Sequence, residues 1–597
     1  MMRNFIRSLS IFLLILFFGI WPGACTISNV KGKEKKKPNV ILVLTDDQGY
    51  GDLACHGNSR IKTPNLDDFY NESIRFTNFH VATTCSPTRS GLMTGRYCNA
   101  VGAWHTIMSR YFLRKGETTI ANIFSNAGYE TAMFGKWHLG DNYPYRPQDR
   151  GFKTTVTHEA GGVGQITDHW NNDYFDDTYL RNGVPEKFSG YCTDIWFSEA
   201  LKFIEENTDK PFFCFISTNA PHGPFHVDSA YIEPYLNDEL IKNPNFYGMI
   251  TNVDENFGKL EARLKELEIA DNTLLIFMTD NGTSKGLSNG FNAGMRGIKG
   301  SEYDGGHRVP FFIRWKDGRL NGGKDIPSIA SYIDVLPTLA DLCEIKIPSE
   351  LKLHGKSLKP LLENKNAEWP ERTLFADTQR ELHLRKWKKS AVMTDRWRLI
   401  NANELYDMTI DSGQINNVAD EYPEVVNKLR ADYDEWWEMI SVKSDQFSSI
   451  PIVPGTTRLT SMDINTEGMV PWNQEQVRAG DVKNGFWMVG FSEKGRYLLK
   501  MYRYPKESGL ALGDSAAPGE AVDGGQAYPE GKALRIVGAG VKLGKSVSEI
   551  KLDSTLLSAD IIVSVPETGD MKLQLWFELA DGRKMVPYYT YVSKIEN

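Results

Sequence analysis

The sequence predicts an α/β fold in which helices cover both faces of a mixed, mostly parallel sheet. Between residues 38 and about 330, apolar runs rich in Val, Ile, Leu and Phe alternate with helical stretches such as 192–207 and 254–269. This alternation is typical of parallel sheets, because their strands are buried on both faces. The four expected central strands are NVILVLT, YETAMFG, PFFCFIST and TLLIFMT.

Polar residues follow each expected strand. They are Asp46 and Asp47, Lys136 and His138, His222, and Asp280 and Asn281. In open sheets of this class, ligands bind beyond the carboxyl ends of the strands. We therefore expect these side chains to converge at one edge of the sheet.

The chain is long enough for several domains. Its 597 residues exceed what a single hydrophobic core usually holds, so two or three domains are expected. We expect a main α/β domain at 38–365 and a smaller sheet-plus-helix subdomain at 366–445, which contains an amphipathic helix near 423–440. Short strands between Gly-rich turns then predict a terminal β-sandwich-like module at 446–597.

The N-terminus predicts export. Residues 1–25 combine two arginines with an apolar run that is short for a membrane span of about 20 residues, and 26–37 form a charged tether. The segment PGAC, which ends at Cys25, resembles a bacterial lipobox, although Pro22 departs from that pattern. Lipidation of Cys25, simple cleavage and a retained signal anchor all stay open. The expected location is the periplasm or the cell surface.

Composition excludes some classes of function. The net charge of -8 argues against a nucleic-acid binder, because phosphate backbones attract basic surfaces. The seven cysteines show neither CxxC pairs nor zinc-type spacing, so a disulfide framework is not expected.

The acidic strand ends predict a metal site. Three carboxylates and one amide oxygen, from Asp46, Asp47, Asp280 and Asn281, are a hard-oxygen set suited to Ca²⁺ or Mg²⁺. The alternative is that they are turn residues and helix caps.

Basic residues predict an oxyanion pocket beside that site. Lys136 and His138 are two residues apart and face the same side of an extended segment. His222 lies between two prolines that stiffen its loop, and Lys299 lies in a Gly-rich loop. The alternative is an exposed lysine and structurally bonded histidines. Together, these groups suit a tetrahedral oxyanion.

A cysteine opens the stretch CSPTRSGLMTGR. Pro87 suits the first turn of a helix, and Thr84 or Ser86 is a potential cap, so Cys85 is expected at a positive helix end. That position lowers a thiol pKa and favours anion binding. The alternative is a buried, inert cysteine.

The motifs taken together resemble those of a known family. In order, they are TDDQG, CSPTRSGLMTGR, GKWHLG, APHGP, TDNG, GIKG and GGHRVPFFIRW, and the resemblance covers about residues 38–440. The sequence resembles the formylglycine-dependent type I sulfatases of the alkaline phosphatase superfamily. The implied fold is alkaline-phosphatase-like.

The resemblance implies a mechanism for sulfate ester hydrolysis. A maturation enzyme would oxidise Cys85 to formylglycine, whose hydrate attacks sulfur and later expels sulfate. One Ca²⁺ would be held by Asp46, Asp47, Asp280, Asn281 and the modified Cys85. Arg89 would steady the attacking oxygen, and Lys136 and Lys299 would neutralise the sulfate. His138 would act as the base, and His222, with or without Lys299, as the acid.

The substrate class follows only by analogy with secreted bacterial sulfatases. We expect sulfated polysaccharides or oligosaccharides. Residues 166–183, rich in aromatics and carboxylates, either line a sugar cleft or form a surface loop with packed aromatics. The rival functions are a phosphate or phosphonate monoester hydrolase of the same fold and a catalytically silent glycan-binding protein. The role of module 446–597 stays open between carbohydrate binding, completion of the active-site wall and stabilisation.

Overall fold

The computed structural model describes residues 36–284, 290–364 and 368–596. Residues 37–597 form one compact unit. The expected export signal, with Cys25, and most of the expected tether lie outside the described residues. Within the described ranges, no helix has both the length and the apolar character needed to cross a bilayer.

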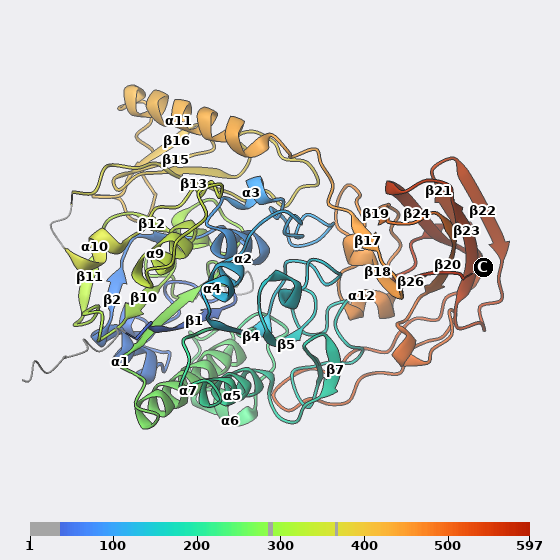
Figure 1. The fold of residues 1–597 in the computed structure, drawn as a ribbon, viewed down its shortest axis with the longest axis horizontal. Helices are drawn as coiled ribbons and strands as arrows, with labels where there is room; N and C mark the ends of the chain where they lie inside the picture. The colour runs from blue at the N-terminus through green and yellow to red at the C-terminus, as the bar shows by residue number, and fades with distance from the viewer. Residues whose placement is uncertain (1–35, 285–289, 365–367, 597) are drawn as a thin grey trace, which may run out of the picture. The chain divides into compact units, whose positions relative to one another are not determined.

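A ten-stranded sheet organises the first part of the chain (Figure 1). Its strands, in spatial order, are β11 (Lys324–Ile326), β2 (Ile74–Phe76), β10 (Phe311–Arg314), β9 (Thr273–Thr279), β1 (Asn39–Thr45), β8 (Phe212–Ser217), β4 (Glu130–Lys136), β5 (Thr154–His158), β6 (Thr178–Arg181) and β7 (Val184–Lys187). The central strands β9, β1, β8, β4 and β5 are parallel. The predicted mostly parallel sheet is confirmed, and its four predicted strands lie side by side.

The sheet edges differ from the simple prediction. Strand β10 runs antiparallel to β9 and β2, and β6 and β7 form an antiparallel hairpin beside β5. Strands β2 and β11 have three residues each, which is too short for a periodic pattern to be recognised. Every residue of β7 is exposed, so that strand has no apolar signal either.

Alternate residues of β1 enter two different cores, because successive side chains of a strand point to opposite faces. Val40, Leu42 and Leu44 pack with one set of helices, and Ile41 and Val43 pack with the other. On the first face lie α2 (Cys85–Thr94), α4 (Ile120–Asn126) and α9 (Val335–Leu342); on the second lie α1 (Pro64–Glu72), α5 (Cys192–Glu205) and α7 (Pro244–Glu266). Figure 1 shows α5 and α7 below the sheet and α2 and α9 above it.

Helix α7 begins ten residues before the expected stretch 254–269. Its N-cap is Asn243, whose side chain accepts a hydrogen bond from the backbone N–H of Phe246, and Pro244 occupies the first helical position. Both features are strong helix-start signals, so the apolar stripe of 254–269 is only the second half of this helix.

Smaller sheets follow the main one. A four-stranded antiparallel sheet comprises β13 (Leu374–Asp377), β14 (Ser390–Met393), β15 (Trp397–Ile400) and β16 (Glu404–Asp407), and α11 (Pro423–Ser441) follows it. The last part has two sheets. One contains β17 (Ile450–Ile452), β19 (Trp487–Phe491), β24 (Gly569–Leu579), β21 (Ile536–Leu543) and β22 (Ser546–Lys551); the other contains β18 (Thr456–Thr460), β26 (Tyr589–Lys594), β20 (Gly495–Tyr502) and β23 (Ala559–Val565).

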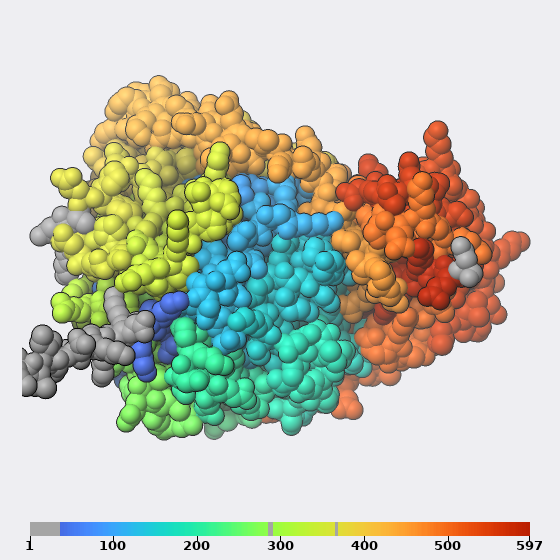
Figure 2. Space-filling view, in the orientation of Figure 1, coloured from blue at the N-terminus to red at the C-terminus, as the bar shows by residue number. Residues whose placement is uncertain are grey.

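Residues 446–597, which we call the C-terminal module, share a hydrophobic core with the main α/β part. Buried Tyr111, Ile166 and Trp170 belong to the same apolar cluster as Trp487 and Leu499 of the module. Figure 2 shows the module, orange to red, packed directly against cyan residues of the main part. The module is therefore held by apolar packing and not by a tether alone.

Candidate active site

The carboxyl ends of β1 and β9 bring the acidic residues together. Thr45 pairs with Thr279 at the ends of these parallel strands, so Asp46 and Asp280 emerge side by side. Asp47 has a φ of 65°, a left-handed conformation that Asp adopts more readily than most residues. The backbone N–H of Asp47 donates a hydrogen bond of 3.2 Å to Oδ1 of Asp280.

The four oxygen-bearing residues fit a divalent cation. Carboxylate oxygens of Asp46, Asp47 and Asp280 lie within 4.8 Å of one another. Two buried oxygens, Oδ1 of Asp46 and Oδ1 of Asn281, accept no hydrogen bond from any described residue. Buried acceptors are normally satisfied, so oxygens left free beside a cluster of carboxylates are the donor set that Ca²⁺ takes.

Three cationic side chains neutralise these carboxylates. Lys136 is fully buried and forms an ion pair with Asp46. Nζ of Lys299 lies 2.5 Å from Oδ1 of Asp47, and the pKa of Asp47 is lowered mainly by this ammonium, against the effect of burial. Nη2 of Arg89 donates to Oδ2 of Asp280 at 2.8 Å. Most of the buried negative charge is therefore matched by fixed positive charge.

Asp280 keeps a raised pKa despite its arginine partner. Burial and the neighbouring Asp46 carboxylate raise the pKa of Asp280 to about 6, and Arg89 lowers it only in part. At this position Arg89 and Lys136 therefore offset burial and carboxylate repulsion only in part.

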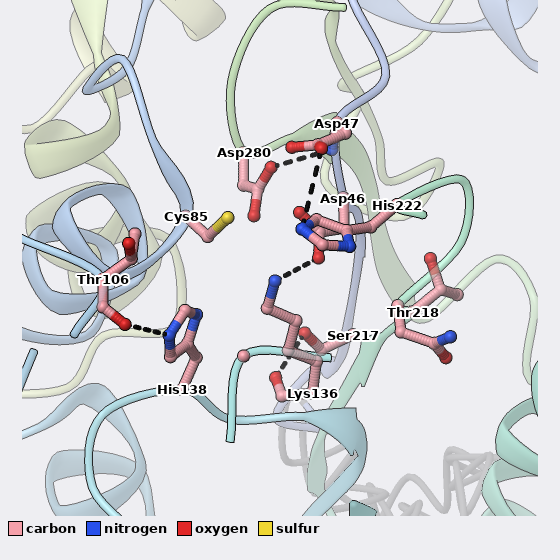
Figure 3. A network of polar contacts seen from close by, with 12 residues as sticks. Asp46, Asp47, Cys85, Thr106, Lys136, His138, Ser217, Thr218, His222 and Asp280 are labelled. Carbon is pink, nitrogen blue, oxygen red and sulfur yellow. Dashed lines mark hydrogen bonds and ion pairs between the residues drawn. The ribbon is translucent and has the colours of Figure 1, made fainter. Parts of the chain in front are cut away.

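Cys85 is the first residue of α2, and its side chain faces the charged cluster. Its Sγ atom is within 4.8 Å of ligand-type atoms of both Asp46 and His222 and lies 3.6 Å from Nζ of Lys299. Figure 3 shows the sulfur facing the Lys136 ammonium and the three carboxylates.

One expectation for Cys85 is wrong, and another is confirmed only in part. The pKa of the thiol is raised to about 12, not lowered, because burial and the carboxylates of Asp46 and Asp280 outweigh the lysines. Thr84 is the N-cap residue, but its side chain makes no capping hydrogen bond, and the hydroxyls of Thr84 and Ser86 have no described partner. The unmodified thiol is therefore a poor nucleophile.

The two histidines present one ring nitrogen each to the site. Nε2 of His138 lies 3.0 Å from the carbonyl oxygen of Thr106, which places the hydrogen on Nε2 and leaves Nδ1 as an acceptor without a described partner. Burial and Lys136 hold the pKa of His138 well below its usual range. Nδ1 of His222 lies 2.6 Å from the carbonyl oxygen of Gly223, so Nε2 faces Asp47 at 3.8 Å. Burial and Lys299 lower the pKa of His222 to about 3.

All the residues expected at the site are brought together, but several cleft residues were missed. A cleft of about 510 Å³ opens over Asp47, His222 and Lys299. It is also lined by residues that the motifs did not indicate: Gln165, Arg380, Trp472, Asn473, Glu475 and Tyr528. Among these residues, only those next to Trp472 belong to a recognisable sequence motif. Asn473 and Gln476 form a capping box, which predicts the start of helix α12 (Gln474–Ala479) but not its place in the cleft.

The stretch 166–183 shows features of both alternatives: it does not line the cleft over Asp47, His222 and Lys299, but it lines a separate hollow of about 520 Å³ and also contains packed aromatics. Trp170, Tyr174 and Tyr179 are buried. The hydroxyl of Tyr174 donates to the carbonyl oxygen of His222 at 2.9 Å, so this stretch supports the catalytic loop from behind.

Comparison with known proteins decides the family. A family model described as "Sulfatase" matches residues 38–345. The chain belongs to the sulfatase family. A second model, "N-sulphoglucosamine sulphohydrolase, C-terminal", matches residues 299–438. The protein is thus a sulfate ester hydrolase with the alkaline-phosphatase-like fold, and the phosphate, phosphonate and silent glycan-binding alternatives are not supported.

Individual relatives agree with this family. The sulfatase is 31% identical to arylsulfatase A of Homo sapiens over 55% of this chain and 68% of that protein. It is 30% identical to an ulvan-active sulfatase of Formosa agariphila over 56% and 67% of the two chains. The crystal structure of Ps i-CgsB in complex with k-i-k-neocarrahexaose superposes with a TM-score of 0.62 and 27% identity, covering 69% of this chain and 95% of that one.

Proposed function

We propose that this sulfatase removes sulfate groups from sulfated polysaccharides or oligosaccharides, using formylglycine at position 85 and one Ca²⁺. The observation that supports this most is the position of Cys85, whose sulfur lies within 4.8 Å of Asp46 and His222 atoms beside a cluster of oxygen ligands. Asp46, Asp47, Asp280 and Asn281 would hold the cation. After its conversion to formylglycine, residue 85 would be a further ligand of this cation.

The modification explains why a thiol with a raised pKa occupies this position. A separate maturation enzyme would replace the thiol by an aldehyde with dioxygen as the oxidant. One oxygen atom enters the aldehyde and hydrogen sulfide leaves, while two electrons and two protons from an external reductant convert the other oxygen atom to water. The hydrated aldehyde would supply a nucleophilic hydroxyl and a second hydroxyl whose proton is removable, and a Ca²⁺ ion held by the acidic residues would polarise the sulfate oxygens. Thiolate nucleophilicity is then not required of Cys85.

The chain's own residues would move the protons and balance the charge. Nδ1 of His138, held unprotonated, is the base for the second hydroxyl. Lys136 and Lys299 would stabilise charge on the sulfate oxygens, and Arg89 would steady the nucleophile while orienting Asp280. His222 would protonate the leaving alcohol, because a bound sulfate brings negative charge that raises its low pKa.

Two relatives and the expected export of the protein support the proposed substrate class. The names of the ulvan-active relative and of the complex with k-i-k-neocarrahexaose both refer to carbohydrates. A polymer substrate is met outside the cytoplasm, which fits the export signal expected at 1–25 and periplasmic or surface location, with or without a lipid at Cys25. We propose 38–365 as the catalytic domain, 366–445 as its subdomain and 446–597 as the accessory module.

Two measurements test this function. The purified, matured protein should hydrolyse an aryl sulfate far faster than the matching aryl phosphate; the reverse preference would refute sulfatase activity. The peptide that contains residue 85 should be about 18 Da lighter than its unmodified form, because the thiol has been exchanged for an aldehyde. An entirely unmodified thiol in active protein would exclude formylglycine.

A further inference from the structure

The C-terminal module closes one side of the catalytic cleft. Asp47, His222 and Lys299 line the cleft on the catalytic side, and Trp472 and Tyr528 line it from the module. These two module residues are 56 positions apart in sequence yet border one cleft of about 510 Å³. A substrate that reaches Lys299 therefore meets the module as well.

This side of the cleft is held in a fixed position. The backbone N–H of Ile166 donates to the carbonyl oxygen of Trp472 at 3.0 Å, and the N–H of Gln474 donates to the carbonyl oxygen of Gly164 at 3.1 Å. The hydroxyl of Tyr528 donates to the carbonyl oxygen of Asn172 at 2.7 Å. A wall that is ordered before binding loses little conformational entropy when a ligand docks on it.

The wall is aromatic and partly exposed. Trp472, Tyr528 and Phe225 all line the cleft, and each has an intermediate solvent exposure. The indole N–H of Trp472 donates to no described residue. Aromatic rings pack on apolar ligand faces, and polar edges such as this N–H provide orientation. A sugar ring offers both an apolar C–H face and hydroxyl edges.

The lining of the cleft contains both cationic and anionic side chains. Among its described lining residues, the cationic or basic ones are His222, Lys299 and Arg380, and the carboxylates are Asp47 and Glu475. Asp47 is paired with Lys299. Glu475 is exposed and makes no hydrogen bond or ion pair with a described residue.

Glu475 lines a second hollow as well as the cleft. Together with Phe225 and Tyr528 it also lines a neighbouring hollow of about 590 Å³, which does not include Lys299 among its described lining residues. Tyr528 borders a third hollow of about 520 Å³, lined by several carboxylates, among them Asp173, Asp176, Glu520 and Asp523. An acidic environment repels any anionic group that a substrate has in addition to its reacting sulfate.

We propose that Trp472, Tyr528, Phe225 and Glu475 form a saccharide subsite that binds an uncharged sugar ring attached to the sulfated one. The aromatic rings stack on the sugar, and the Glu475 carboxylate accepts hydrogen bonds from its hydroxyls. The same carboxylate rejects a uronic acid or a second sulfated sugar at this position. The proposal rests on the proposed function, because it assumes that the sulfated ring occupies the end near Lys299.

The test measures inhibition of aryl sulfate hydrolysis by the matured full-length protein. The inhibitors are matched pairs of disaccharides that join a sulfated hexose to either a neutral hexose or a hexuronic acid. For at least one pair, the neutral member should bind about tenfold more tightly, the ratio that corresponds to about 1.4 kcal/mol. Glu475→Gln should bring this ratio towards one, whereas Glu567→Gln, an exposed glutamate elsewhere in the module, should preserve it.

A second variant isolates the aromatic wall. Trp472→Ala should weaken inhibition by the neutral disaccharide about tenfold more than inhibition by the sulfated monosaccharide alone. Trp472→Phe should retain most of the inhibition that the alanine variant loses. The backbone bonds of Trp472 survive both changes, and Trp472→Phe covers the case in which the alanine variant fails to fold.

The outcomes separate the two proposals. If the wild-type protein does not hydrolyse the aryl sulfate, the proposed function fails. If hydrolysis occurs but no neutral disaccharide binds better than its uronic partner, or Glu475→Gln leaves the ratio as it was, the subsite proposal alone is overturned.

Discussion

The Nζ atom of Lys299 lies 3.6 Å from the Sγ atom of Cys85, although 214 residues separate them in sequence. The same ammonium lies 2.5 Å from a carboxylate oxygen of Asp47. Lys299 therefore connects the position of the nucleophile with the group of oxygen ligands. A sulfate ester bound between them would place its developing negative charge beside a fixed positive one.

Removing this charge should slow the reaction. Lys299→Met keeps the length of the side chain but loses the ammonium, and we expect kcat/KM for an aryl sulfate to fall by about 10²- to 10³-fold, as for loss of other preorganised electrostatic groups. Lys545→Met, on an exposed turn of the module, is the control and should stay within about twofold of wild type. Equal effects of the two changes would contradict the role of Lys299.

Cys85 should be essential for activity but not for folding. Cys85→Ala is expected to lower kcat by at least about 10⁴-fold, because no other described side chain takes over covalent catalysis. Cys98 is equally buried, at 2% exposure, but lies away from the cluster. Cys98→Ala should keep kcat within about threefold while lowering stability by about 1 kcal/mol. Steady-state kinetics and thermal unfolding of both variants provide the test. An active Cys85→Ala protein would refute the proposed role of residue 85 as the nucleophile.

Gly161 supports the base by leaving room for it. A Cβ atom at Gly161 would lie 2.2 Å from Cε1 of His138, so Gly161→Ala must displace the imidazole. We expect kcat on an aryl sulfate to fall by about 10- to 100-fold, the cost of a displacement on the order of 1 Å. Gly116→Ala has no atom within 4 Å of the added carbon and serves as the control. Wild-type kcat in Gly161→Ala would show that the position of His138 is unimportant.

Buried His105 should make the fold sensitive to acid. Its Nδ1 accepts hydrogen bonds from the N–H groups of Thr106 and Ile107, at 2.6 and 3.2 Å, and burial and Arg380 lower its pKa to about 3. Since the unfolded chain binds this proton near pH 6.5 and the folded chain does not, stability is present above that pH and is lost as pH falls towards 3.

Replacing His105 with asparagine, whose amide oxygen accepts hydrogen bonds but does not titrate, isolates the contribution of His105 to acid sensitivity. Between pH 7 and pH 5, wild type should lose about 2 kcal/mol more unfolding free energy than His105→Asn does. His383 is exposed, and His383→Asn should track wild type. Denaturant midpoints at the two pH values measure the difference, and parallel losses in wild type and His105→Asn would rule the explanation out.

The shared core predicts that the module and the main part unfold together. Ile166 is fully buried in the cluster that contains module residues such as Trp487 and Leu499. Ile166→Ala should cost about 2–5 kcal/mol and lower a single unfolding transition. Val547, 58% exposed in β22, gives the matched control, with a change within about 0.5 kcal/mol for Val547→Ala. Two separate transitions, only one of them shifted, would show that the module unfolds independently.

The sequence by itself determined the central sheet and the residues at its carboxyl edge. Runs such as NVILVLT are apolar throughout because a central parallel strand is buried on both faces, and β1 has the expected bounds Asn39–Thr45. Asp46, Asp47, Asp280 and Asn281 could be grouped in advance, since parallel neighbours end at the same edge. These features depend on local pattern and on one general rule of topology.

Only the tertiary structure decided the electrostatics of Cys85 and the composition of the cleft. The start of a helix suggested a lowered thiol pKa, but burial and the carboxylates of Asp46 and Asp280, which follow strands β1 and β9, raise it to about 12. Gln165, Arg380, Trp472 and Tyr528 meet over the catalytic groups although they are far apart in sequence. These contacts depend on how segments distant in sequence pack against one another. A local sequence pattern does not show which residues the rest of the chain will bury or which charges it will place beside them.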